Sequence, residues 1–98
     1  MPTLHVLSHS PFNDDRLDSC LRLLGSEDAL LLCGDAVYAL HEGCDPQAKL
    51  IRANLSHRLF ALDEDLKARA IDSPLMQSVD YSAFVELTLR FDKVNSWL

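Results

Sequence analysis

The chain has 98 residues, of which 48% are hydrophobic and 24% are charged, and it contains only 3 glycines and 4 prolines. This composition excludes disordered, collagen-like and low-complexity proteins and fits a single domain over residues 1–98. Nine basic and fifteen acidic side chains give a net charge of −6. Because nucleic-acid backbones and anionic membranes are normally bound through a basic patch, we expect no direct binding to either.

The first third of the sequence predicts a strand, a helix and a second strand. Residues 3–7 form the first strand, and Asp14 or Asp15 is a plausible N-cap for the helix that follows. Four side chains of this helix recur at i, i+3, i+4 and i+7 and so share one buried stripe: Leu17, Cys20, Leu21 and Leu24. The continuous apolar run at 29–33 is typical of a strand covered on both faces.

The rest of the sequence continues the alternation. We expect helices at 36–41 and 46–54, a strand at 57–62, a helix that begins at residue 63, a strand at 76–79 and a helix at 81–91. Asp80 is the expected N-cap of the last helix, and Phe84, Val85 and Leu87 are expected on its apolar side. Trp97 is expected to pack within the chain or against another subunit. The pattern predicts an α/β domain of three layers, with a mainly parallel sheet of about four to five strands flanked by helices.

Familiar motifs for cofactor and metal binding are absent from the sequence. It contains neither GxGxxG nor GxxxxGK[ST], and no GxSxG elbow surrounds its serines. Four histidines invite a metal interpretation: His5, His9, His41 and His57. Their spacing, with that of the cysteines, matches no common set of ligands, so we expect partly exposed imidazoles, no metal and no cofactor.

The three cysteines are the remaining candidates for chemistry. An odd number without a CxxC pair favours free thiols in the cytoplasm. Cys33 ends an apolar run and is most simply a small core residue, while Cys44 lies in an expected loop beside Asp45, which disfavours its thiolate. Cys20 lies on an apolar stripe, which favours burial, but near the start of a helix, where the helix dipole favours a thiolate. Both interpretations of Cys20 stay open.

Several short phrases occur in order along the chain. They are Leu4-His5, Ser10-Pro11-Phe12, Asp35 after an apolar strand, Leu62, Asp65-Leu66-Lys67-Ala68-Arg69, Asp80-Tyr81, Phe84-Val85 with Leu87-Thr88, and Trp97. Together they resemble the TusB/DsrH family of small sulfur-relay subunits over essentially the whole chain.

That resemblance implies a DsrE-like α/β fold and a place in a heterohexamer with TusC-like and TusD-like sister subunits. In the tRNA branch of the family, such a complex passes persulfide sulfur from a TusA-type carrier to a TusE-type acceptor for 2-thiolation of the wobble uridine of tRNA. In the dissimilatory branch, a DsrEFH complex passes sulfur to DsrC. In both branches the principal cysteine belongs to another subunit, so this chain is expected to be a non-catalytic member.

The phrase Ser19-Cys20-Leu21 resembles the DsrH branch, which implies that Cys20 is a possible auxiliary persulfide site. The chain departs from the family where Asp35-Ala36 replaces the usual Asp-Gly. Three functions stay open: a subunit of a sulfur-relay complex of either branch, a stand-alone thiol sulfurtransferase that uses Cys20, and an interaction module of unrelated function.

Overall fold

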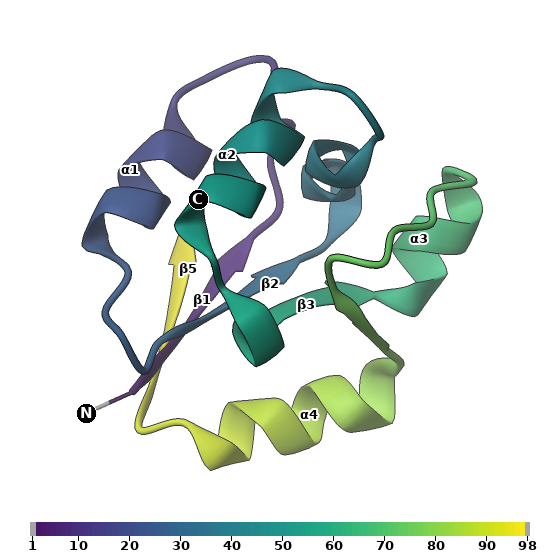
Figure 1. Ribbon diagram of the computed structural model, residues 1–98. Helices are drawn as coiled ribbons and strands as arrows, with labels where there is room; N and C mark the ends of the chain where they lie inside the picture. The colour runs from purple at the N-terminus through teal and green to yellow at the C-terminus, as the bar shows by residue number, and fades with distance from the viewer. Residues whose placement is uncertain (1, 98) are drawn as a thin grey trace.

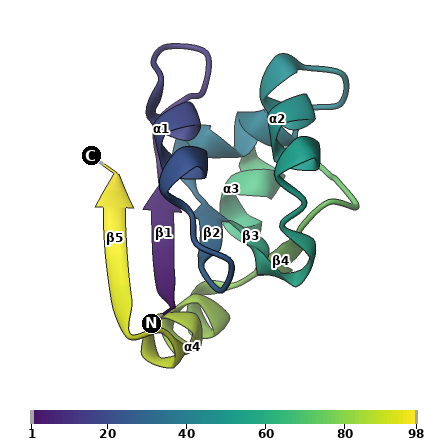
Figure 2. The same ribbon diagram turned by 60° about the vertical axis from the view of Figure 1, so that its left-hand side comes forward.

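The sheet is entirely parallel and has five strands. The structure, a computed structural model, describes residues 2–97. The strands are β1 (Thr3–Leu7), β2 (Ala29–Leu32), β3 (Leu59–Leu62), β4 (Gln77–Val79) and β5 (Lys93–Trp97). They lie in the order β4-β3-β2-β1-β5, so the C-terminal strand forms one edge beside the N-terminal strand (Figure 2). The predicted α/β class with a mainly parallel sheet is confirmed.

Helices cover the two faces of the sheet unequally (Figure 1). They are α1 (Arg16–Leu23), the 3-10 helix η1 (Gly34–Leu40), α2 (Asp45–Ala53), the 3-10 turn η2 (Ser56–Arg58), α3 (Asp63–Ala68) and α4 (Tyr81–Arg90). Side chains of α1, η1, α2 and α3 share one core cluster with the sheet. The opposite cluster receives a helical contribution from α4 alone, through the buried Leu87. One face is therefore covered by several helices and the other by a single helix.

The two central strands explain the apolar runs of the sequence. All four residues of β2 and all four of β3 are buried, because helices lie on both sides of these strands. The stripe predicted for α1 is also confirmed, since Leu17 and Cys20 are buried and Leu21 and Leu24 pack against the same core.

Two of the expected elements differ from the structure, and one strand was not expected. The segment predicted as a helix at 36–41 is the 3-10 helix η1, which begins at Gly34, where a φ of +53° turns the chain sharply out of β2. The strand expected at 57–62 begins only at residue 59, because residues 56–58 form the turn η2. The last strand, β5, was not predicted as a strand because its first four residues are exposed and show no apolar alternation.

The predicted apolar side of α4 needs one further correction. Asp80 caps this helix as expected, since its Oδ1 accepts a hydrogen bond from the backbone N–H of Ala83 at 2.8 Å. Leu87 is buried against the sheet, but Val85 is 56% exposed. The apolar surface of α4 is therefore wider than the part that the sheet covers.

The structure also bears on membrane insertion. Within residues 2–97, no helix combines the length and the apolar character needed to span a bilayer.

Candidate functional site

Cys20 lies in the core. It is the fifth residue of α1, faces the sheet and is 0% exposed. The favourable effect of a helix dipole is confined to the first turn, so this position gives Cys20 little help in forming a thiolate. Burial, helped by the negative charge of Asp28, raises the pKa of the Cys20 thiol from its ordinary value of 9.0 to about 12. At neutral pH the side chain is a protonated, inaccessible thiol, whereas nucleophilic sulfur chemistry needs an accessible thiolate.

A polar network lies beside this thiol and joins β5 to the rest of the fold. The indole Nε1–H of Trp97 donates to Nδ1 of His5 at 3.1 Å. An indole can only donate, so the other ring nitrogen of His5 carries the hydrogen and faces Oδ2 of Asp28 at 3.4 Å. His5 is buried, which corrects the expectation of a partly exposed imidazole.

Asp28 is the hub of this network. Burial opposes its ionisation, but hydrogen bonds from the backbone N–H groups of Gly25 and Thr3, each 2.8 Å, outweigh burial and lower the pKa of Asp28. Its carboxylate thus links the start of β1 to the loop after α1, and through His5 it supports Trp97. Sequence reasoning missed this network, because the sequence separation between His5 and Trp97 is 92 residues and no local pattern joins them.

The carboxyl edge of the sheet carries a second cluster, built from the phrases that resemble the family. Oδ2 of Asp65 accepts the backbone N–H of Gly34 at 2.8 Å, which ties α3 to the turn after β2. The guanidinium of Arg69 pairs with Asp35 at 2.9 Å and lies over the ring of Tyr38, with its central carbon 5.7 Å from the ring centroid. These contacts hold η1 against α3, so the cluster stabilises the edge where parallel sheets usually place ligands.

The other two thiols are half-buried. The Sγ of Cys33 lies 3.7 Å from the carbonyl oxygen of Leu7, and burial, with the charge of Asp65, raises the pKa of Cys33. Cys44 is the N-cap residue of α2, with its Sγ 3.7 Å from the carbonyl oxygen of Ala39, rather than a freely exposed loop residue. The environment of Cys33 therefore opposes formation of a thiolate.

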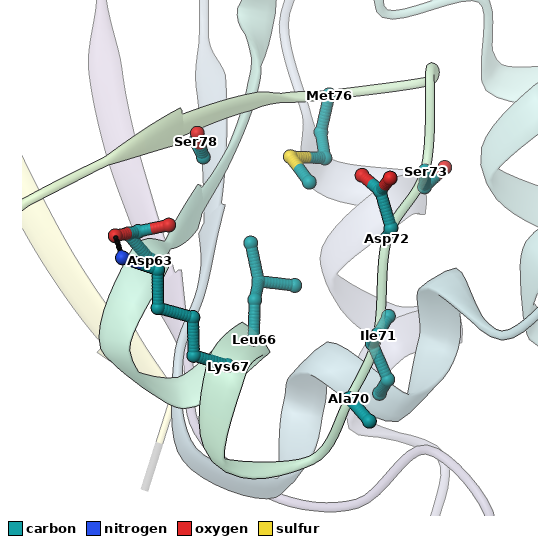
Figure 3. A pocket seen from close by; sticks show the side chains of 9 residues that line it. All are labelled: Asp63, Leu66, Lys67, Ala70, Ile71, Asp72, Ser73, Met76 and Ser78. Carbon is teal, nitrogen blue, oxygen red and sulfur yellow. Dashed lines mark ion pairs between the residues drawn. The ribbon is translucent and has the colours of Figure 1, made fainter.

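A cleft of about 560 Å³ opens between α3 and β4 (Figure 3). Its apolar floor includes Leu66, Ile71 and Met76, and its walls carry Asp72 and the ion pair between Asp63 and Lys67 at 2.9 Å. No cysteine or histidine lines this cleft. It is therefore separate from every thiol that the sequence singled out.

The histidines differ in their surroundings. His41 and His57 are exposed, and Nδ1 of His9 is buried without a hydrogen-bond partner in the part of the chain that the structure describes. Among residues 2–97, no three His, Cys, Asp or Glu side chains come together as metal ligands would.

Comparison with known proteins assigns the family. The family model described as DsrH like protein matches residues 9–94. The chain belongs to the DsrH-like family. Relatives include Protein TusB of Yersinia enterocolitica and Protein TusB of Enterobacter sp. strain 638, each 35% identical over 97 residues, which are 96% of this chain and 99% of the relative. The resemblance to TusB and DsrH proteins is confirmed.

The fold of this DsrH-like chain also occurs in a solved structure. The ychN protein of E. coli matches it with a TM-score of 0.74, covering 99% of this chain and 100% of that chain. The two sequences are 19% identical, so the similarity concerns the fold.

Proposed function

We propose that this chain is a subunit of a sulfur-relay complex, in which it has a structural role and other subunits carry the reactive cysteine. The observation that carries the proposal is the similarity to TusB proteins over 96% of the chain. In this role the complex passes persulfide sulfur from a TusA-type carrier towards a TusE-type acceptor, and the sulfur is used for 2-thiolation of tRNA wobble uridine. The complex is expected to be a heterohexamer with TusC-like and TusD-like subunits, in the cytoplasm, where thiols stay reduced.

The thiol environments support a non-catalytic role. Cys20 is fully buried with a pKa near 12, and burial also raises the pKa of Cys33. A persulfide carrier must expose a thiolate to its donor and then to its acceptor. An auxiliary role for Cys20 would require α1 to move away from the sheet. This requirement favours the relay subunit over a stand-alone sulfurtransferase.

A DsrH-type role in sulfur oxidation is the second candidate. The phrase Ser19-Cys20-Leu21 and the match to the DsrH-like family favour it. The relatives named TusB, at 35% identity, favour the tRNA branch. The two candidates share the same chemistry within the complex and differ in the final acceptor.

Affinity isolation from the native cell tests the assembly. A tagged chain should bring down two related small subunits at equal stoichiometry in mild salt, and the identity of the acceptor that receives labelled sulfur from the complex should separate the branches. Isolation of the chain without any related subunit would contradict the proposal.

A further inference from the structure

The outer side of α4 carries an apolar stripe that no part of the described chain covers. Tyr81, Val85 and Leu89 are spaced by four residues, and they are 53%, 56% and 81% exposed. Residues four apart on a helix differ by about 40° around its axis, so the three side chains form one continuous row. The buried Leu87 points to the sheet, which leaves this row facing outward. Figure 1 shows α4 as the outermost element on its side of the molecule.

Two opposite charges border the stripe on one flank. Glu86 and Arg90 are one helical turn apart, are both exposed, and take part in no ion pair within residues 2–97. Both line the same hollow beside β3 and β4. Their charges therefore remain available to a partner on the same flank of α4.

We propose that the outer stripe of α4 is a contact between two copies of this chain, packed as antiparallel helices about a two-fold axis. An axis that passes midway between Glu86 and Arg90 sets the Glu86 of each copy opposite the Arg90 of the other. The same axis lies beside Leu89, the most exposed apolar residue of the stripe, so the two Leu89 side chains meet at the centre, with a Val85 on either side. Val85, Leu89 and the two charges therefore face the same residues of the other copy, as an isologous contact requires, while Tyr81 lies beyond the end of the partner's helix.

The contact is small. A ten-residue helix is about 15 Å long, whereas a stable interface usually buries about 800 Å² on each partner. The net charge of −6 on each copy also opposes association, although physiological salt screens most of this repulsion. We expect a dissociation constant on the order of 10 to 100 µM for the isolated chain, which becomes effective when further subunits hold the copies together.

Charge exchange gives a sharp test by analytical ultracentrifugation of the full chain between about 1 and 500 µM. Leu89→Glu should remain monomeric, while the matched control Leu23→Glu, at another apolar side chain that is 67% exposed, should associate as the wild type does. Glu86→Arg and Arg90→Glu should each weaken association at least tenfold, because each places like charges opposite one another. An equimolar mixture of these two variants should recover the wild-type affinity, since both pairs are restored across the heterodimer.

A second measurement applies to the chain inside its purified complex. Leu89→Cys should give a crosslinked dimer of this chain with a short bis-maleimide, whereas Leu23→Cys and the wild type should not. A wild-type chain that stays monomeric at 500 µM and also fails to crosslink through residue 89 would overturn the proposal. Equal effects of the substitutions at 23 and 89, or no recovery in the charge-exchange mixture, would overturn it as well. Neither measurement depends on sulfur transfer, so the proposed function is tested separately.

Discussion

Cys20 packs as a core side chain would, and its environment opposes the chemistry that its sequence context suggested. The helical stripe predicted its burial, and the structure places it fully inside. What the sequence could not supply is Asp28, whose negative charge adds to the effect of burial on the thiol. Residue identity alone therefore overstates the reactivity of this cysteine.

The raised pKa of Cys20 predicts a loss of stability in alkali. The folded state keeps its proton up to a pKa of about 12, whereas the unfolded chain releases it above about 9, so stability falls as the pH rises between these values. At pH 10 this linkage costs about 1 kcal/mol. Chemical unfolding of the wild type and Cys20→Ala at pH 7 and pH 10 should show their difference shrinking by about this amount. A difference that is the same at both pH values would contradict the buried, protonated thiol.

Arg69 is expected to stabilise the carboxyl edge of the sheet. Its side chain is 22% exposed, and it bonds Asp35 while covering Tyr38. Arg69→Ala should lower the midpoint of thermal unfolding, because a charge-assisted hydrogen bond and a cation–π contact are lost together. Arg52→Ala on α2, where the side chain is exposed, is the matched control and should change stability by less than about 0.5 kcal/mol. Equal effects in thermal unfolding would show that the edge cluster contributes nothing.

Among the five residues of β5, only Trp97 is partly buried. The first four residues of the strand are exposed, and its hydrogen-bonded neighbour is β1. The Trp97 indole holds its far end through His5, in a network that also includes the carboxylate of Asp28. The sequence predicted that Trp97 would pack, but gave no reason to expect a strand.

Removal of residues 95–98 should therefore destabilise the protein by more than the loss of one exposed strand end. The deletion exposes the ring nitrogen of His5 and the apolar surface beneath Trp97, which costs about 2 kcal/mol or more. Trp97→Phe is the conservative comparison: it keeps most of the packing but removes the donor, and should cost about 1 kcal/mol. The deletion should therefore lower the midpoint of thermal unfolding more than Trp97→Phe does. An unchanged midpoint for the deletion would refute the proposed role of Trp97.

The elements that could be predicted are those whose buried side chains give the sequence a regular pattern of apolar residues. β1 and the apolar interior of β2 follow directly from the pattern, and Asp80 marks the start of α4 correctly. η1 could not be distinguished from an α-helix, because a segment of seven residues is too short to separate the apolar spacing of a 3-10 helix from that of an α-helix. The network of His5, Asp28 and Trp97 could not be predicted at all, since it joins three distant segments.

In the whole molecule, the helices cover one face of the sheet more completely than the other. One face of the sheet is covered by α1, η1, α2 and α3, while the other receives α4, whose outer stripe stays exposed. A domain of this size has a limited core, so contacts with other subunits would add to its stability. The uneven covering leaves one side of the domain available for the subunit contacts that we propose.

The charge of the molecule predicts that the isolated chain does not bind tRNA. A net charge of −6 repels a phosphate backbone, and association would lack the release of counterions that normally drives it. Gel-shift titration of the isolated chain at physiological salt should show no complex below about 1 µM. A submicromolar complex with tRNA would contradict this expectation and would give the chain a direct part in acceptor binding.

In the function that we propose, the chain supports sulfur transfer without carrying the sulfur. The most direct test of this function is transfer of labelled persulfide sulfur by the reconstituted complex containing Cys20→Ser or Cys20→Ala in place of the wild-type chain, with assembly checked by gel filtration. Because Cys20 is fully buried with a pKa of about 12, we expect an assembled complex that retains most of its transfer rate, with at most a modest loss. Complete loss of transfer in a properly assembled complex would contradict this expectation and would make Cys20 an essential sulfur carrier.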